Sequence, residues 1–279
     1  MVELWKQSGW TYRFYNDQDA ADFMDRHFPP QVREAFDAIV PGALRADLFR
    51  YCVLLIHGGV YADVDVLLES NLDELLWGNV GFMVPLDEPG DQRGHQYCFW
   101  NGLLATTPGH PFVAKAIEMV VNHVRNRFTV VDVDDTMCPN PDLQVTHMYD
   151  ALLLTGPCAL GAATNLVLGR PPQSNFEVGN MALHSDDIPG RTVVLKQNKS
   201  DLGCHRFTWV ERNWIVAATD LPPLANSSSN ETHYSAKYDF TGMHVAADVY
   251  RDWNKANEVI ELRVAETHTQ WEIQSQLVS

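Results

Sequence analysis

The sequence predicts an α/β fold organised as a single domain. Short apolar segments rich in β-branched residues alternate along the chain with stretches whose apolar residues recur at helical spacing. A length of 279 residues and a hydrophobic share of 46% suffice for one sizeable core. Eight Trp and twelve Phe argue against a disordered chain. The formal net charge of -16 shows no basic footprint, so we expect no nucleic acid among the partners.

The first part of the chain is expected to hold one strand followed by helices. Residues 10–15 alternate in polarity, which predicts a strand. Asn16 can cap a helix that runs to about His27, and a pair of prolines ends that helix. A short helix is then expected over 31–40, and a longer one begins near Ala43.

The helix that begins near Ala43 has a buried stripe and a separate polar face. Its stripe consists of residues at helical spacing: Leu44, Leu48, Cys52 and Leu55. Asp47 and Arg50 stand three residues apart and therefore share another face. The pair can form an intrahelical ion pair, as the spacing alone indicates, or bind a ligand, an interpretation that gains weight because two carboxylates follow the helix.

Two carboxylates follow this helix closely. A double glycine at 58–59 ends the helix and leads into a short apolar strand over 60–62. Asp63 and Asp65 come next, and on an extended backbone residues two apart point to the same side. Their repulsion favours a bound cation, and oxygen ligands favour Mg²⁺ or Mn²⁺. Residues 132–134 have the same spacing without the helix or the double glycine, and we interpret them as an exposed loop.

Later segments are expected to complete the sheet and its helices. We expect strands over 81–85, 98–105 and 191–195, helices over 112–127 and 159–167, and a helical or extended segment over 148–154. Asn101 is a polar residue within an apolar run and needs a partner, either a structural hydrogen bond or a sugar. Gly156 lies in a Thr-Gly-Pro turn that can present backbone N–H groups to a ligand. The residues after 257 are expected to form a tail that packs loosely or extends.

The region from Arg45 to Asp65 resembles the glycosyltransferases whose sugar-binding region contains a D-x-D motif. This family-32-like group includes fungal initiating mannosyltransferases and inositol-phosphoceramide mannosyltransferases. The matching residues stand at fixed spacing: Arg45, Ala46, Asp47, Arg50, Tyr51, Leu54, Gly58, Gly59, Tyr61, Asp63 and Asp65. The resemblance implies a GT-A fold, with a Rossmann-like, mostly parallel central sheet flanked by helices. The resemblance places the catalytic domain at 1–257 and a C-terminal tail at 258–279. The similarity to the family begins after the family's usual first strand, which we expect to be missing from this sequence.

The resemblance also implies a reaction and a set of site residues. The reaction is retaining transfer of a hexose from GDP-mannose or a UDP-hexose to a hydroxyl of a glycan or glycolipid. Asp63 and Asp65 would be catalytic and would bind Mn²⁺ or Mg²⁺, with His244 as a further metal ligand. Asp47 and Arg50 would hold hydroxyls of the donor sugar. Further substrate contacts would come from Arg45, Tyr61, Asn101 and Gly156.

The length of the apolar runs and the family resemblance both bear on the location of the protein. The sequence contains no run of about twenty apolar residues, so we expect no membrane anchor within it. In a eukaryote, the resemblance implies the Golgi lumen, with an anchor upstream. The five cysteines are scattered without a C-x-x-C pair, which disfavours a structural zinc site.

Two other functions stay open. The chain lacks the Ser-Trp that usually follows the late histidine of the family, so a non-catalytic relative that binds nucleotide sugars or glycans is an alternative. A phosphatase with an aspartate nucleophile also uses D-x-D with Mg²⁺. Such an enzyme prefers Thr or Val where this chain has Leu67, so it is the weaker alternative.

Overall fold

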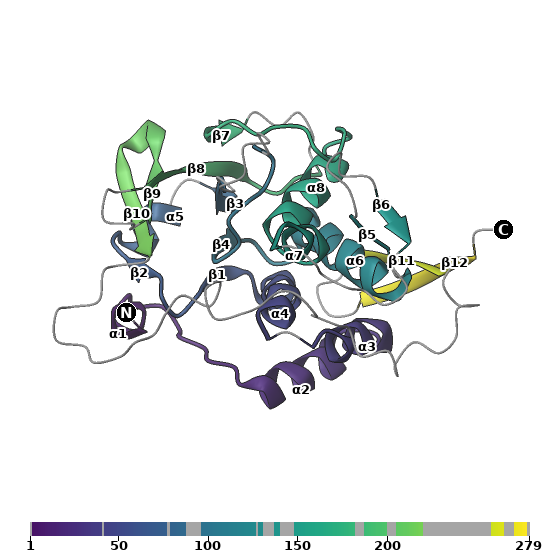
Figure 1. The fold of residues 1–279 in the computed structure, drawn as a ribbon. Helices are drawn as coiled ribbons and strands as arrows, with labels where there is room; N and C mark the ends of the chain where they lie inside the picture. The colour runs from purple at the N-terminus through teal and green to yellow at the C-terminus, as the bar shows by residue number, and fades with distance from the viewer. Residues whose placement is uncertain are drawn as a thin grey trace. The chain divides into compact units, whose positions relative to one another are not determined.

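The computed structural model describes residues 2–40, 42–76, 79–87, 96–126, 128–130, 137–139, 148–181, 187–199, 205–219, 258–264 and 271–277. These residues form two compact units. The first unit draws on described residues of 1–13, 60–106 and 175–239 and contains the main sheet. The second draws on described residues of 14–59, 107–174 and the C-terminal strands, and most of it is helical. Figure 1 shows the helices and strands of both units.

The first unit is built on an eight-stranded sheet of described residues. Its strands are β1 (Gly59–Ala62), β2 (Leu67–Leu68), β3 (Val80–Pro85), β4 (Leu103–Thr106), β7 (Gly179–Met181), β8 (Arg191–Lys199), β9 (His205–Trp209) and β10 (Trp214–Thr219). Their order is β1-β4-β3-β8-β9-β10-β2, and β7 also pairs with β8. β3 and β8 run parallel, whereas β3–β4, β7–β8, β8–β9, β9–β10 and β10–β2 are antiparallel pairs. The α/β class is confirmed, but the mostly parallel, Rossmann-like character of the sheet is not.

The core of the first unit lies against the sheet. Buried residues from β3, β8, β9 and β10 form one cluster with Leu72 and Leu75 of the short helix α5 (Leu72–Leu76). The N-terminal helix α1 (Val2–Lys6) reaches this cluster through Trp5, which packs against it. The Trp5 Nε1–H donates to Val66 O at 2.8 Å, so α1 anchors the segment directly after the two carboxylates.

The second unit is dominated by helices. They are α2 (Asp17–His27), α3 (Pro30–Ala38), α4 (Gly42–His57), α6 (Pro111–Asn126), α7 (Met148–Leu154) and α8 (Pro157–Val167). α6 packs against α4 and α8, as the ribbon in Figure 1 also shows. Two strand pairs accompany them: β5 (Phe128–Val130) with β6 (Met137–Pro139), and β11 (Glu258–Val264) with β12 (Trp271–Leu277). The helices expected from periodicity are confirmed, and 148–154 is helical.

The structure corrects two local predictions and decides a third. The strand predicted over 10–15 is wrong, because 11–16 form neither helix nor strand and Tyr15 instead packs edge-on against Phe23 and Phe49. The strand predicted over 98–105 begins only at Leu103, as β4, because the residues before it form a bridge and a turn. Of the two alternatives for the residues after 257, extension is confirmed over β11 and β12, which pair along their whole length, and β11 contacts α6.

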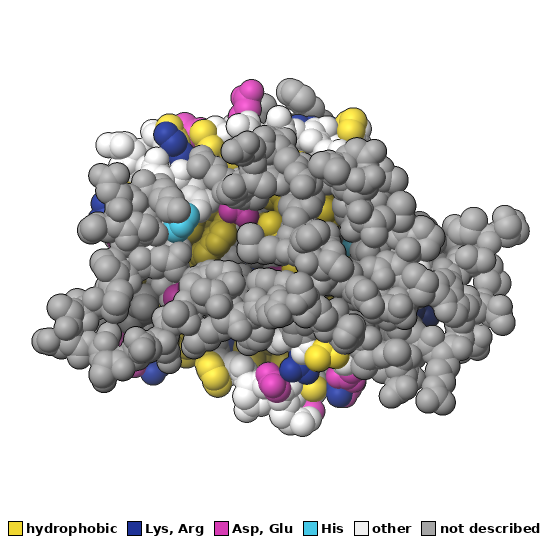
Figure 2. All heavy atoms as spheres, viewed as in Figure 1, with side chains coloured by type: hydrophobic (Ala, Val, Ile, Leu, Met, Phe, Trp, Pro, Cys, Tyr) yellow, Lys and Arg dark blue, Asp and Glu magenta, His cyan; other side chains and the backbone are white. Residues whose placement is uncertain are grey.

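The charged side chains that Figure 2 shows in colour are dispersed over the face in view. On the face seen in Figure 2, acidic and basic side chains occur in small separate groups. This pattern fits a solvated acidic surface, as the net charge indicates. Among the helices that the structure describes, none is both long and apolar enough to cross a membrane.

Candidate active site

The polar face of α4 lies inside a hydrogen-bonded cluster of the second unit. Arg50 has a side chain only 6% exposed, and its Nη2 lies 3.2 Å from Asp47 Oδ1. The Thr155 hydroxyl donates to the other carboxylate oxygen, Asp47 Oδ2, at 2.8 Å. The intrahelical ion pair expected from the spacing is therefore present, and both oxygens of Asp47 already have a partner.

The same cluster fixes the start of α8 against α4. The buried Tyr51 hydroxyl donates to Thr155 O at 3.0 Å and also lies 3.3 Å from Gly156 O. Gly156 is the N-cap of α8, and a Cβ there would lie 3.2 Å from Leu152 Cα and 3.4 Å from Asp47 Oδ2. Glycine therefore permits a close approach of the turn to the carboxylate. The negative charge of Asp47 lies near a helix N-terminus, where it is favourable.

Arg45 points away from this cluster within the second unit. Its Nη2 lies 3.8 Å from Asp17 Oδ2 of α2, and its guanidinium carbon lies 5.7 Å from the centre of the Phe36 ring in α3. These contacts give Arg45 a structural role between helices. A substrate contact for Arg45 stays a prediction.

The backbone angles at 58 and 59 and the packing around 58 require the double glycine after α4. Gly58 and Gly59 have φ of +62° and +88°, which residues with a side chain rarely adopt. The Gly58 N–H donates to Leu54 O at 2.8 Å and closes α4. A Cβ on Gly58 would lie 2.5 Å from Pro108 Cδ, so the close packing also demands glycine.

Asp63 and Asp65 lie on a turn instead of an extended strand. β1 ends at Ala62, and the Val66 N–H donates to Asp63 O at 3.0 Å, which closes a β-turn. The expectation that extended backbone aligns the two carboxylates is therefore wrong. The turn forms because Val66 enters the core and is fully buried, while Val64 at its tip is 73% exposed.

Asp63 is positioned by its neighbours in the first unit. Its N–H donates to Gly102 O at 2.8 Å, and the Tyr61 hydroxyl donates to Asp63 Oδ1 at 3.0 Å. A Cβ on Gly102 would lie 2.7 Å from Asp63 Oδ2 and 2.6 Å from the Trp100 ring, so Gly102 leaves the room that this oxygen occupies. Asn101 is buried beside it, at 5% exposure, and a sugar contact for Asn101 stays a prediction.

The carboxylates of the turn suit a hard divalent cation. Mg²⁺ is usually held by one or two carboxylates together with phosphate oxygens and water, and Mn²⁺ also prefers oxygen ligands. In the part of the chain that the structure describes, no group of three or more His, Cys, Asp or Glu side chains could hold a metal. Two carboxylates are a donor set of the kind that holds such a cation together with phosphate oxygens of a ligand. His244 lies outside the described residues, so its metal role stays a prediction.

Sequence reasoning missed several residues that build these sites. Thr155 was part of an expected turn, but its hydroxyl contact to Asp47 joins residues 108 apart in sequence. Gly102 lies 39 positions after Asp63, and no local pattern marks it as a neighbour. Fixed spacing reveals contacts within one helix or turn, and neither of these contacts is of that kind.

The comparisons with known proteins point to one family. Residues 4–80, which include α4 and the D-x-D turn, match the family model described as "Glycosyltransferase sugar-binding region containing DXD motif". A protein of Saccharomyces cerevisiae with the name "Putative glycosyltransferase HOC1" is 26% identical over 138 residues, which cover 44% of this chain and 34% of that protein. Inositol phosphoceramide mannosyltransferase 1 of Schizosaccharomyces pombe is 28% identical over 197 residues, which cover 70% of this chain and 58% of that protein.

Two facts bound these similarities. The match covers 34% to 58% of the length of these two relatives. Among solved structures, the PaToxG glycosyltransferase matches with a TM-score of 0.36 and 16% identity, over 55% of this chain and 45% of that one, a similarity too low to bear on the fold. The resemblance seen in the sequence is confirmed as a similarity: residues 4–80 match the model of the D-x-D glycosyltransferases' sugar-binding region.

Proposed function

We propose that the protein is a metal-dependent glycosyltransferase that takes a hexose from a nucleotide sugar. The observation that carries the proposal is the turn with Asp63 and Asp65, which lies within the region matched by the family model. A relative named as a mannosyltransferase makes GDP-mannose the first donor to test, followed by UDP-hexoses. That relative's name also supports a hydroxyl of a glycolipid as the acceptor, and a glycan hydroxyl rests on the family resemblance.

Asp63 and Asp65 would bind the diphosphate of the donor through Mn²⁺ or Mg²⁺. When bound, the cation would offset the charge that develops on the departing nucleoside diphosphate. Tyr61 fixes one oxygen of Asp63, and Gly102 leaves space for the other. This arrangement orients the carboxylate before a ligand arrives, and such preorganisation is a large contribution to catalysis.

The roles of the α4 cluster belong to the same proposal. Asp47 and Arg50 would hold hydroxyls of the donor sugar, as the resemblance implies. These roles are supported by the position of the Asp47 carboxylate, which Thr155 and Gly156 hold against the start of α8. Retention of anomeric configuration and a GT-A fold rest on the family resemblance alone.

An oxidising compartment is part of the proposal. Cys98 and Cys158 are each in a disulfide, whereas Cys52 is a free, buried thiol. Disulfides persist in secretory compartments and are rare in the cytosol. We therefore place the protein in the lumen of the secretory pathway, with the Golgi as the specific expectation.

The decisive experiment compares two identical tripeptides of the chain. Asp63-Val64-Asp65 and Asp132-Val133-Asp134 have the same sequence, so Asp134→Ala is a matched control for Asp65→Ala. Hydrolysis of GDP-mannose and of UDP-hexoses is measured with Mn²⁺, with Mg²⁺ and with EDTA. Asp65→Ala and EDTA should each reduce turnover on the order of 10²–10³-fold, and Asp134→Ala should not.

Two outcomes would redirect the assignment. Turnover that survives both EDTA and Asp65→Ala would rule out the D-x-D turn as the site. Calorimetric binding of GDP or UDP with Mn²⁺, without turnover of any donor, would identify a non-catalytic relative. Release of phosphate from a phosphomonoester by the wild type, dependent on Asp63, would instead support the phosphatase.

A further inference from the structure

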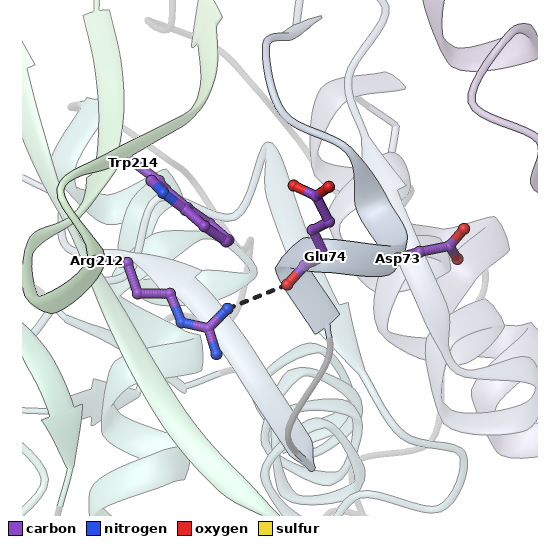
Figure 3. Close-up of a pocket in the computed structure, with 4 residues that line it drawn as sticks. All are labelled: Asp73, Glu74, Arg212 and Trp214. Carbon is purple, nitrogen blue, oxygen red and sulfur yellow. Dashed lines mark hydrogen bonds between the residues drawn. The ribbon is translucent and has the colours of Figure 1, made fainter.

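A cavity lies in the first unit, between α5 and the turn that joins β9 to β10. Its volume is about 630 Å³, and it is lined by Asp73, Glu74, Arg212 and Trp214 (Figure 3). Small-molecule sites commonly have volumes of about 300–1,000 Å³. The cavity is therefore large enough for a ligand, and its residues are not among those expected to bind the donor.

The Arg212 side chain is held in place without a ligand. Its guanidinium carbon lies 4.3 Å from the centre of the buried Trp209 ring and 5.0 Å from that of Trp214. The Arg212 Nη1–H also donates to Glu74 O at 3.1 Å, the bond drawn in Figure 3. Two cation–π contacts and a hydrogen bond thus keep the floor of the cavity preformed.

Two groups of different chemistry face each other across the opening. Trp214 is 36% exposed, so part of its ring is available to a ligand. The Glu74 carboxylate stands on the other side of the opening and makes no hydrogen bond or ion pair with the residues that the structure describes (Figure 3). Asp73 accepts a hydrogen bond from Trp10 Nε1 at 2.8 Å and is held on the outer side of α5.

This set of groups favours a neutral polyol. An anion would be repelled by Asp73 and Glu74, and a cation would meet the guanidinium of Arg212. A sugar ring offers hydroxyls that donate to Glu74, oxygens that accept from Arg212 and an apolar C–H face that stacks on Trp214. We propose that this cavity binds a neutral sugar residue of a glycan. The proposal uses neither Asp63 nor Asp65 and holds whether or not the chain transfers sugar.

The test measures binding of neutral oligosaccharides to the full chain. The probes are α-1,6-mannotriose and maltotriose, with inorganic phosphate and tetramethylammonium as charged comparators, and the readouts are calorimetry and tryptophan fluorescence. At least one oligosaccharide should bind. Trp214→Ala should weaken that binding about tenfold or more, Trp214→Phe by less than about threefold, and Glu74→Gln by about three- to tenfold. Val210→Ala, in the same turn and 46% exposed, is the control and should leave the affinity unchanged.

Several results would overturn the proposal. They are no binding of either oligosaccharide at tens of millimolar, tighter binding of phosphate or tetramethylammonium, and an affinity unaffected by Trp214→Ala and Glu74→Gln. Circular dichroism checks each variant, and if Trp214→Ala does not fold, Trp214→Phe and Glu74→Gln decide. Asp65→Ala separates this proposal from the proposed function. Under the cavity proposal, the Asp65→Ala variant still binds the oligosaccharide. If this variant lost oligosaccharide binding, the glycan would bind at the D-x-D turn instead of the cavity.

Discussion

The Asp47 cluster of α4 and the Asp63–Asp65 turn use aspartates in opposite ways. In the cluster, the side chains of Asp47 and Arg50 are 14% and 6% exposed, and both oxygens of Asp47 have protein partners. In the turn, both aspartates are half-buried, as Asp47 is, but Val64 between them is 73% exposed. The side chains of the cluster are held by hydrogen bonds and an ion pair within their unit, whereas the turn carries an exposed residue between its two aspartates.

This difference separates stability from ligand binding. Removal of one partner from a buried ion pair leaves an uncompensated charge, which destabilises the fold strongly. A half-buried carboxylate keeps contact with water, so its loss affects folding little. We therefore expect substitutions in the cluster to lower the free energy of unfolding, and substitutions at the turn to lower metal-dependent binding.

The largest effect on folding is expected for Arg50→Ala. This variant leaves the Asp47 carboxylate without its cation, and the free energy of unfolding should fall by about 3–5 kcal/mol. Urea unfolding followed by circular dichroism measures the change. Arg33→Ala is the control, since its ion pairs with Asp25 and Asp37 are partly exposed and should contribute about 1 kcal/mol or less. Equal losses in the two variants would show that burial of the α4 pair carries no special weight.

A second substitution tests whether the turn depends on space. Gly102→Ala places a Cβ against Asp63 Oδ2 and the Trp100 ring, so the free energy of unfolding should fall by about 1–3 kcal/mol. The displaced carboxylate should also weaken calorimetric binding of Mn²⁺ with GDP. Gly42→Ala is the control, because a Cβ there has no neighbour within 4 Å among the described residues. Unchanged stability and metal binding in Gly102→Ala would show that Asp63 has room to move.

Elements with local signals could be predicted from the sequence. α2 begins after Asn16 because the Asn16 side chain and Asp19 form a capping box, which the sequence displays directly. α4 ends at the double glycine because those two positions need positive φ. The family motif lies in this part of the chain, so the site residues of α4 and the turn could be named in advance.

Features that depend on distant residues could not be predicted. The turn at 63–66 forms because Val66 enters the core and Trp5 binds Val66 O, and neither fact is visible in the tripeptide itself. The mainly antiparallel pairing of the sheet depends on the β8–β9–β10 meander. The apolar pattern of a segment does not reveal whether its strand pairs parallel or antiparallel with a neighbour. The cavity beside Trp214 likewise joins α5 to a turn far along the chain.

Acid offers a test that acts on the helical unit. Burial lowers the pKa of His110 to about 3, whereas its ordinary value is 6.5. The unfolded chain therefore binds a proton that the folded chain does not, between pH 6.5 and 3. The stability that neutral His110 confers is fully present above pH 6.5 and decreases as the pH falls through this window. At pH 5 the loss should be about 2 kcal/mol.

His110→Asn should remove this dependence while keeping an acceptor for the Phe112 N–H, which now donates to His110 Nδ1 at 3.3 Å. The urea midpoints of unfolding at pH 7 and pH 5, compared between the wild type and the variant, measure this pH dependence. Burial also lowers the pKa of His123, so some acid sensitivity should remain in the variant. An unchanged difference between the two pH values would mean that His110 is not the group responsible.

The smallest effect on folding is expected for Tyr61→Phe. The variant loses the hydrogen bond from the Tyr61 hydroxyl to Asp63 Oδ1, which water can replace in part, so the free energy of unfolding should fall by about 1 kcal/mol or less. The carboxylate loses its orientation, however, and residues that orient metal ligands typically affect affinity about 10–100-fold. Calorimetry with Mn²⁺ and GDP should therefore show a loss of about tenfold. Tyr12→Phe, at an exposed tyrosine of the same unit, should show neither change. If Tyr61→Phe lowered stability and left metal binding intact, the turn would behave like the buried cluster, and the distinction between the two regions would fail.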